Sequence, residues 1–468
     1  MSTTISINPI TRISGFMEIE VKLENNKVVD AKSSGLLFRG FEKMMIGKSP
    51  FDAIYFTERI CGICSTAHAV TSSLALEDAF KVSVNENDRM LRDIIHGMEF
   101  MQNHIRHFYL YTLPDFVVTP DIQPISSKTN YDLRLPEELN KEISEHYLEA
   151  IRISRLAHKG CATLGGKAPH THGIFLGGVT EGMDATRYIR LKELISEIKN
   201  FIINKMIPDV YIIGDYYKDY YSLGYGYKNL MTYGLYDKYS EKELTYVKPS
   251  VLIDGNIGEF QEDKITENIY NSWYSGESIQ NDMFLEKTED DMSKENAYSF
   301  VKSPRYEEKP VEVGPLARMI LSGNYENRIS TMDRTIARVL EAKKMIETIE
   351  KLLERVNYDG VSQRKYIVPD SSKGRGLTDT TRGALGHWLS IENKQISHYN
   401  IITPSAWNCS PTDSKGVRGV IEMALIGTEI QNPKEPAEIG RIVRSFDPCI
   451  SCATHVLSDR MSPLEIII

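Results

Sequence analysis

The sequence predicts an α+β protein that is mainly helical, with a central bundle of long helices and small β-rich segments around it. Long stretches carry an apolar residue every three or four positions, as amphipathic helices do. The first forty residues instead alternate between apolar and polar side chains, as half-buried strands do. With 468 residues the chain can bury an ample core, and we expect one domain over residues 1–468.

The N-terminal part, residues 1–60, is expected to be β-rich. Residues 17–24 alternate strictly between apolar and charged side chains, which predicts a strand with one buried face. Asn25-Asn26 then supplies a turn signal into a second strand.

Three long helices are predicted in the remainder of the chain. One follows Asn87, one runs from Glu138 to Gly160, where glycine can end it, and one begins near Ser330, which is spaced to form a cap with Asp333. The buried faces expected for the first and third comprise Leu91, Ile94, Ile95, Met98, Gln102, Ile105 and Tyr109, and Val339, Ala342, Ile346, Ile349, Leu353 and Val356.

These helices divide the chain into further expected parts. Residues 85–207 form the helical core, and 208–310, which are rich in tyrosine and charge, form an α+β insertion. Residues 311–455 are expected to be helical and to close over the candidate site, and 456–468 form a C-terminal extension.

Composition excludes several classes of function. The formal charge of −9 argues against a nucleic-acid-binding surface. The sequence contains no apolar run of the roughly 18 residues that a membrane span needs, and Met1-Ser2-Thr3-Thr4 begins no signal peptide. We therefore expect synthesis in the cytoplasm, with any export or membrane attachment depending on a partner.

Four of the six cysteines form two Cys-x-x-Cys pairs near opposite ends of the chain: Cys61 with Cys64, and Cys449 with Cys452. Such pairs hold two thiolates close enough to chelate one soft metal. Spacing alone leaves a structural zinc site and an iron–sulfur cluster open. Zinc ribbons, however, separate their pairs by roughly 15–20 residues. Pairs this far apart favour a buried site with chemistry in it.

The residues around both pairs resemble the paired signatures of the large subunit of nickel–iron hydrogenases. The first reads Arg59-Ile60-Cys61-Gly62-Ile63-Cys64 and the second Asp447-Pro448-Cys449-Ile450-Ser451-Cys452, each followed by a histidine, His68 or His455. The resemblance covers nearly the whole chain. Further matching stretches, in the expected order, are Asn8-Pro9-Ile10-Thr11-Arg12-Ile13, Phe38-Arg39-Gly40-Phe41-Glu42, residues 102–109, Gly165-Gly166-Lys167 and residues 382–388.

This resemblance implies a nickel–iron centre bound by the four cysteines. Cys61 and Cys449 would be terminal nickel ligands, whereas Cys64 and Cys452 would bridge nickel to an iron that also carries carbon monoxide and cyanide. Cleavage of the substrate H₂ would be heterolytic. The Cys449 thiolate would accept the released proton, because metal binding keeps it deprotonated yet still basic.

Three more residues match positions around that centre. Arg382 would lie over the metals, Asp447 would pair with it, and His68 would donate a hydrogen bond to a bridging sulfur. The alternatives from the residues alone are a surface ion pair for Arg382 and a satisfied core histidine for His68.

A magnesium site is also implied by the resemblance. Its ligands would be the Glu42 carboxylate, the Ile401 backbone carbonyl and His455, with water molecules completing the octahedron.

Two positions depart from the family pattern. Ser14 stands where the family has a glutamate that accepts the proton from the terminal cysteine, and Asn103 stands where an aspartate is common. Glu18 could replace the missing carboxylate, but the alternation of its strand turns it away from the core. We therefore expect a relay through the Ser14 hydroxyl and ordered water.

The remaining cysteines, Cys161 and Cys409, stand singly, so no iron–sulfur cluster is expected in this chain. The resemblance implies an obligate heterodimer with an iron–sulfur small subunit. It also implies nickel-insertion chaperones and an endopeptidase that removes residues 456–468 after nickel insertion.

Two other classes remain open. One is an H₂ sensor or low-activity homologue, and the other is a metal-free structural subunit of a related quinone reductase.

Overall fold

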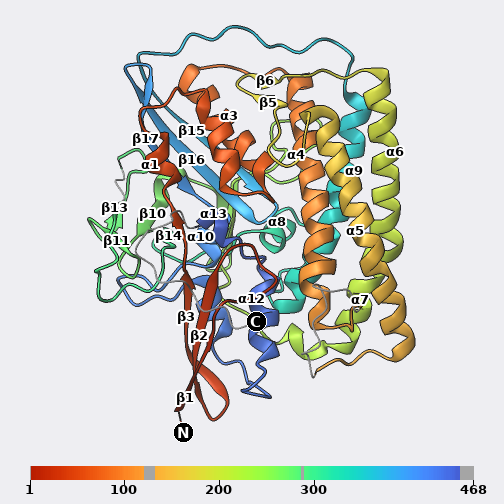
Figure 1. Ribbon diagram of the computed structural model, residues 1–468, viewed down its shortest axis with the longest axis vertical. Coiled ribbons are helices and arrows are strands. Elements are labelled where there is room, and N and C mark those ends of the chain that lie inside the picture. Colours follow the sequence, from red (N-terminus) through yellow and green to blue (C-terminus); the bar gives the residue numbers. More distant parts are fainter. Residues whose placement is uncertain (1, 121–131, 286–288, 454–468) are drawn as a thin grey trace.

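The computed structural model describes residues 2–120, 132–285 and 289–453. Long helices stand together on one side of the molecule and small sheets lie on the other (Figure 1). In the described residues, each sheet has two or three strands. The structure thus combines helices and sheets, as the predicted α+β class requires.

Four long helices form the bundle: α4 (Glu86–Arg106), α5 (Glu137–Gly165), α6 (Ala185–Phe201) and α9 (Thr331–Arg355). Helix α4 packs against α5 and α9, and α6 packs against the same two (Figure 1). Every residue of the two predicted apolar faces is buried. The hydrophobic core of the bundle was therefore correctly read from the period of the sequence.

The predicted helix ends are right in one case and wrong in another. Ser330 caps α9 through a hydrogen bond from the Asp333 amide to its hydroxyl, as expected. Helix α5, however, continues past Gly160 and ends where Gly166 adopts a φ of +77°. A Cβ at Gly160 would lie 2.7 Å from the Met98 sulfur, so this glycine allows α5 to approach α4 and does not end the helix.

The N-terminal residues form the predicted sheet. Strands β1 (Ser2–Ile7), β2 (Met17–Glu24) and β3 (Lys27–Gly35) are antiparallel in sequence order. Asn25 and Asn26 both have positive φ, which matches the two-residue turn that suits a twisted hairpin.

The expectation that residues 311–455 are helical is wrong for residues 371–402. They form an antiparallel sheet of β15 (Ser371–Thr380), β16 (Gly383–Glu392) and β17 (Gln395–Ile402). All but the last residue of β16 are buried, so this strand has no solvent-facing side and shows no alternation of apolar and polar residues. The sequence signal for a strand was absent for that reason.

This sheet packs on α3 (Ser65–Phe80), the helix that begins directly after the first cysteine pair. Two glycines of β15 make the close approach possible. A Cβ at Gly374 would lie 2.2 Å from the Ala75 carbonyl oxygen, and one at Gly376 would lie 2.0 Å from that of Thr71. Strand and helix therefore meet backbone to backbone.

The other helical segments, all short, are α1 (Phe41–Met45), α2 (Asp52–Thr57), η1 (Glu58–Ile60), η2 (His107–Thr112), η3 (Leu113–Asp115), η4 (Ile202–Met206), α7 (Ile207–Tyr216), η5 (Lys218–Tyr221), η6 (Glu262–Lys264), α8 (Pro315–Leu321), α10 (Pro404–Asn408), α11 (Val420–Leu425), α12 (Ala437–Ser445) and α13 (Ile450–Ala453). The other strands are β4 (Phe38–Arg39), β5 (Ile174–Phe175), β6 (Gly178–Val179), β7 (Leu230–Thr232), β8 (Ser250–Ile253), β9 (Asn256–Glu259), β10 (Ile265–Asn268), β11 (Tyr274–Ser275), β12 (Ile279–Gln280), β13 (Glu289–Asp290) and β14 (Ser303–Tyr306). None of the described helices is long and apolar enough to cross a bilayer.

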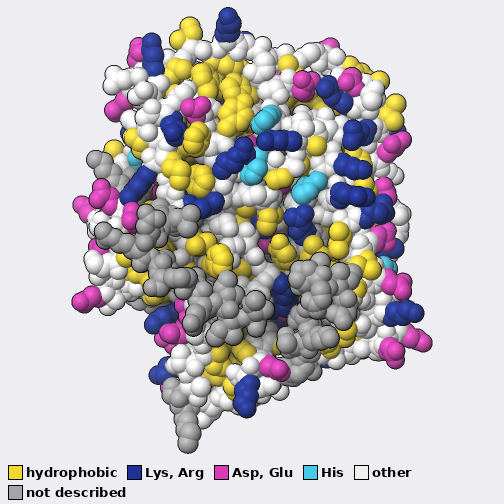
Figure 2. Space-filling model, viewed as in Figure 1, with side chains coloured by type: hydrophobic (Ala, Val, Ile, Leu, Met, Phe, Trp, Pro, Cys, Tyr) yellow, Lys and Arg dark blue, Asp and Glu magenta, His cyan; other side chains and the backbone are white. Residues whose placement is uncertain are grey.

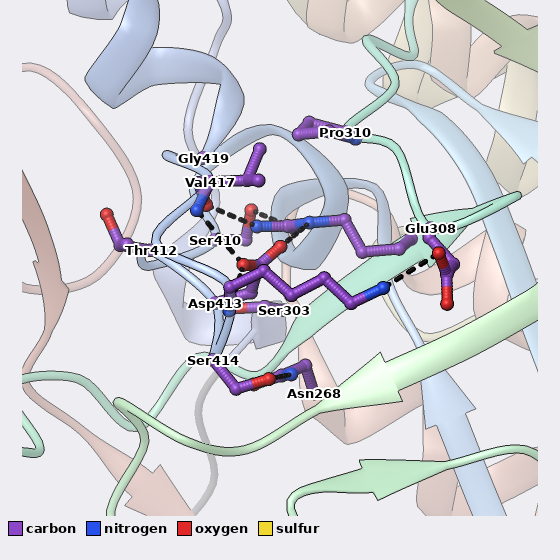
Figure 3. A network of polar contacts seen from close by, with 12 residues as sticks. Asn268, Ser303, Glu308, Pro310, Ser410, Thr412, Asp413, Ser414, Val417 and Gly419 are labelled. Atoms are coloured by element: carbon purple, nitrogen blue, oxygen red, sulfur yellow. Dashed lines mark hydrogen bonds and ion pairs between the residues drawn. The ribbon is translucent and has the colours of Figure 1, made fainter.

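A buried arginine ties the insertion to the C-terminal part of the chain. Arg305 on β14 donates from Nε to Asp413 at 2.9 Å and from Nη1 to Ser410 at 3.1 Å. It also donates from Nη2 to the Val417 carbonyl at 3.2 Å. Figure 3 shows these partners gathered on the loop 410–419, which leads into α11.

We predict that Gly376→Ala lowers the free energy of unfolding by about 1–3 kcal/mol, because the new methyl group meets α3 backbone that has no room to move. Urea unfolding measures the change. Gly360→Ala is the control, since no atom lies within 4 Å of a Cβ there, and it should change stability by less than about 0.5 kcal/mol. Equal unfolding midpoints for the two variants would contradict the close packing of β15 on α3.

Candidate metal centre

Three cysteine sulfurs meet in the interior. The Sγ atoms of Cys61, Cys64 and Cys449 all lie within 4.8 Å of one another, and all three residues are buried. Cys61 follows η1, Cys64 is the N-cap of α3, and Cys449 lies between α12 and α13. The side chain of Cys452, the predicted fourth ligand, lies outside what the structure describes.

The spacing of these sulfurs fits a metal bound by thiolates. The Cys61 and Cys449 sulfurs are 3.4 Å apart, far beyond the roughly 2.05 Å of a disulfide. Two thiolates that each lie about 2.3 Å from one ion, at angles between about 90° and 110°, would be separated by about 3.3–3.8 Å. Sulfur ligands of this kind select soft metals.

The N-terminal segment holds the second cysteine cluster in place. Ser14 pairs with Cys449 as a parallel β-bridge, and its carbonyl accepts from the Ile450 amide at 2.7 Å. Gly15 has a φ of +88°, and a Cβ there would lie 2.5 Å from the Ser451 nitrogen. Only glycine fits this contact, which brings residues near both ends of the chain together.

Arg39 links the two cysteine clusters directly. Its Nη2 donates to the Ile60 carbonyl, just before Cys61, and to the Ser451 carbonyl, just after Cys449. One guanidinium therefore joins the backbones of both clusters.

Arg382 and Asp447 are paired, as predicted, beside the sulfurs. Arg382 lies in the turn between β15 and β16, and its Nη2 lies 3.0 Å from Asp447 Oδ1. Burial opposes the charge of Arg382, but Asp447 and the three cysteines outweigh it and raise the arginine pKa well above its usual value. Burial likewise opposes ionisation of Asp447, but Arg382, His107 and Arg338 lower the pKa of this carboxyl. Both groups are therefore charged.

Asn103 and Arg338 complete this arrangement. Asn103 accepts from Arg382 Nη2 at 2.9 Å and donates to Asp447 Oδ2 at 3.0 Å, so its amide bridges the pair. Arg338 Nη1 lies 3.2 Å from the same Asp447 oxygen. Arg338 was missed by sequence reasoning, although a charged residue within the apolar pattern of a buried helix was a possible signal.

One nitrogen of Arg382 has no hydrogen-bond partner among the described residues. Nη1 is buried and makes no hydrogen bond to any described residue. Buried donors are nearly always satisfied, so this one indicates a further acceptor beside the sulfurs. An acceptor ligand on a metal held by those sulfurs would satisfy it.

Known proteins match this chain over most of its length. A family model described as nickel-dependent hydrogenase matches residues 39–130 and 127–455. The large subunit of a periplasmic [NiFeSe] hydrogenase from Desulfomicrobium baculatum is 36% identical, covering 97% of this chain and 95% of the relative. The chain belongs to the nickel-dependent hydrogenase family.

Other hydrogenases agree with this assignment. The Hydrogenase-1 large chain of Escherichia coli is 29% identical, with 98% of this chain and 96% of the relative covered. The oxidised [NiFeSe] hydrogenase structure from D. vulgaris Hildenborough superposes with a TM-score of 0.93 at 36% identity, covering 97% of this chain and all of that chain. This chain is thus a hydrogenase large subunit, an oxidoreductase acting on H₂, and it has cysteine at all four positions of its two clusters.

His68 of this hydrogenase subunit lies on α3, one turn after Cys64. Its Nδ1 lies 3.1 Å from His387 Nε2, and His387 Nδ1 lies 2.9 Å from the Tyr399 hydroxyl. Burial lowers the pKa of His68 to about 3, so the ring is neutral. The Cys449 charge acts in the opposite direction, which puts the ring close to the sulfurs. Its predicted bond to a bridging sulfur stays a prediction.

The residues predicted to bind magnesium are only partly described. Glu42 on α1 accepts from the Ile401 amide at 2.9 Å, which brings its carboxylate to the Ile401 backbone. His455 lies outside the described residues, so the third predicted ligand is not placed.

The two candidates for the proton acceptor differ in position. The Ser14 hydroxyl lies 3.4 Å from the Ser451 hydroxyl, close to Cys449 in the chain fold. Glu18 on β2 accepts a hydrogen bond from Ser6, on the face of the strand opposite the buried Met17. The orientation expected for Glu18 is confirmed.

A buried carboxylate anchors both segments that flank the second cysteine cluster. Asp115 binds Arg12 at 2.6 Å and Arg444 through two bonds of 2.7 Å. Burial would raise its pKa, but Arg12 and Arg444 lower it to about 2. The ionised carboxylate thus holds Arg12, which precedes Ser14, against Arg444, which precedes Asp447.

Asp115→Asn should lower the free energy of unfolding by about 3–5 kcal/mol at pH 7, because it leaves the buried Arg444 and the partly buried Arg12 without their shared counter-charge. Since the folded pKa lies below the unfolded value of about 3.9, the advantage of the wild type is complete above about pH 4 and falls as pH approaches 2. Urea unfolding from pH 7 to pH 3 measures both effects. Asp219→Asn, which breaks an exposed pair with Arg134, should cost less than about 1 kcal/mol. Equal losses in the two variants would contradict this anchor.

Proposed function

We propose that Cys61, Cys64, Cys449 and Cys452 bind the nickel–iron centre of this hydrogenase, with Arg382 beside the open side of the metals. The observation that carries the proposal is that Arg382 Nη1 has no hydrogen-bond partner in the described part of the chain, on a guanidinium whose pKa is raised by Asp447 and by three convergent cysteines. A cyanide ligand on the iron would accept its hydrogen bond. Carbon monoxide would be the second kind of iron ligand.

The bound nickel–iron group would supply heterolytic cleavage of H₂. The protein's own residues would then handle charge and protons. Arg382 presents a fixed positive charge to the sulfurs, and Asp447 with Asn103 keeps its guanidinium from rotating. Cys449 Sγ would take the released proton, since a bound thiolate remains a base. The Ser405 hydroxyl, which accepts from the Cys449 amide at 2.9 Å, holds this turn in position.

Magnesium bound by Glu42, the Ile401 carbonyl and His455 would link α1 to the C-terminal part of the chain. The closeness of Glu42 to the Ile401 backbone supports this site. Hard cations prefer such carboxylate and carbonyl oxygens.

An iron–sulfur small subunit would carry the electrons away. In the described part of the chain, Cys161 and Cys409 are the remaining cysteines, and they lie in different core clusters. Figure 2 shows hydrophobic side chains interspersed with Lys, Arg and His on one face of the molecule. Exposed Tyr55 and Gly62 lie close in sequence to Cys61, so a partner docked there would be near the metals. We place maturation, by nickel-insertion chaperones and an endopeptidase, in the cytoplasm.

Two other functions are disfavoured by the site. A metal-free structural subunit would not need three buried cysteines and an arginine with an unused donor. An H₂ sensor would have the same residues. The rate of H₂ turnover by the heterodimer therefore has to distinguish an enzyme from a sensor.

The heterodimer purified with its small subunit should contain nickel and iron in a one-to-one centre, with infrared bands of carbonyl and cyanide. Cys64→Ser should lose both metals, because one of the thiolates is removed. Cys161→Ser, at a buried lone cysteine on α5, should keep them. Metal analysis and infrared spectroscopy give the result. Zinc alone in the wild type, or equal metal content in the two variants, would rule the site out.

Mature subunit should lack residues 456–468. Intact-mass spectrometry of nickel-loaded, active heterodimer should show a chain that ends after His455, whereas chain made without nickel should keep Ile468. Active enzyme that retains Ile468 would refute the processing step.

A further inference from the structure

Glu58 is a buried carboxylate without a hydrogen-bond partner. It lies in η1, three residues before Cys61, and its side chain is 0% exposed. Neither of its oxygens makes a hydrogen bond to a described residue. Among the described residues, its carboxylate has an ion-pair contact with Arg59, whose Nη1 lies 4.0 Å from Oε2. Such a group has no structural reason to be a glutamate, because burial without partners costs free energy.

A second buried carboxylate, Glu99, contacts the backbone just after the first cysteine pair. Glu99 on α4 accepts from the Thr66 amide at 2.7 Å and from the Ala67 amide at 3.0 Å. It therefore caps the first turn of α3, whose N-cap residue, Cys64, provides no side-chain cap. Its carboxylate thus sits at the helix end that carries a candidate metal ligand.

Both carboxyls are held partly protonated near neutral pH, and the Glu99 charge acts on Glu58. Burial is the main cause that raises the pKa of Glu58 to about 8, and the Glu99 charge adds to it. Burial also raises the pKa of Glu99 to about 7, against the effect of its amide partners and of Arg382. The influence of Arg382 on Glu99 puts this carboxyl within electrostatic reach of the metal centre.

Groups at the surface face Glu58 from the outside. Arg59 and Lys167, both exposed, lower its pKa. His170, which is partly exposed, lies with Nδ1 3.1 Å from the Glu58 carbonyl oxygen, and its amide donates to the Ser65 hydroxyl at 2.9 Å. Burial raises the pKa of the exposed Tyr55, and the Glu58 charge raises it further. A proton on Glu58 is therefore only one layer of side chains from solvent.

We propose that Glu99 and Glu58 form a proton relay from the cysteine sulfurs to the surface at Arg59 and His170, in place of the carboxylate route that this chain lacks at Ser14. The proposal rests on the hydrogenase function described above. A thiol S–H bond breaks and an O–H bond forms on Glu99, directly or through one water. Glu99 then transfers a proton to Glu58, which releases it to solvent. No electrons move in these steps, and each carboxyl returns to its starting state.

The first test uses the full chain produced without nickel, so that it does not depend on turnover. Infrared spectra recorded between pH 5 and pH 9 should show a carboxylic-acid band at pH 7, where an ordinary glutamate with a pKa of about 4.3 is ionised. Glu58→Gln should weaken this band, and the part that remains should come from other buried carboxyls such as Glu99. Glu18→Gln, at the carboxylate that points away from the core, should leave it unchanged.

The second test uses the metal-loaded heterodimer. Glu58→Gln should slow H₂/D⁺ exchange at least about tenfold and increase the solvent isotope effect on H₂ oxidation, with unchanged carbonyl and cyanide bands. Glu58→Asp should recover part of the rate. A structural role for Glu58 would change metal content or the infrared bands, but not the isotope effect.

The relay is overturned if Glu58→Gln exchanges within twofold of wild type while fully loaded, or if Ser14→Ala alone slows exchange. An acid band in Glu58→Gln that is as strong as in the wild type also overturns it. Failure of the proposed function is a different result: wild-type heterodimer without nickel, iron or H₂ turnover.

Discussion

The structure of the site depends on one buried carboxylate, Asp447, which forms ion pairs with Arg382 and Arg338. A carboxylate without exposure persists only where opposite charges compensate for its desolvation, and here both guanidiniums contact it. Asp447 has a φ of +56°, so the chain turns sharply there and presents Cys449 two residues later. The same carboxylate orients Arg382 toward the sulfurs. The position of the second cysteine cluster and the position of the Arg382 guanidinium beside it therefore both depend on Asp447.

Closure of the site relies on backbone contacts from distant parts of the chain. Gly15 admits the backbone of Ser451, Ser14 pairs with Cys449, and Gly374 and Gly376 admit α3. A side chain on Gly15 would push the N-terminal segment away from the second cysteine cluster, and one on Gly374 or Gly376 would push β15 away from α3. The departure at Ser14 therefore leaves the architecture intact, because the contact there is made by the backbone. Serine at position 14 removes a carboxylate that could accept a proton. The buried carboxyls Glu58 and Glu99, which flank the first cysteine pair in the chain fold, are the proposed replacement.

Periodicity was enough for three of the four bundle helices, α4, α5 and α9, and for the first hairpin, whereas α6 was not predicted. The stripe of α9 and its Ser330 cap are local features, and hydrophobic burial follows directly from them. Periodicity was not enough for β16, which is buried on both sides and so shows no alternation. Nor did it explain Gly160, where a glycine is needed because Met98 of the neighbouring helix lies so close. Arg338 and Glu58 were missed for a related reason: their importance lies in which groups surround them, and sequence alone does not report neighbours.

The sequence by itself determined the chemistry: two cysteine pairs, an arginine, an aspartate and the family to which they belong. Residue type and order are read directly from the sequence, and thiolates select soft metals wherever they converge. Only the tertiary structure decided that three of the sulfurs meet within 4.8 Å. It also decided that, among the described residues, Arg382 Nη1 and the buried Glu58 carboxylate have no hydrogen-bond partner. Distances and solvation depend on packing among segments hundreds of residues apart, and no local pattern encodes them.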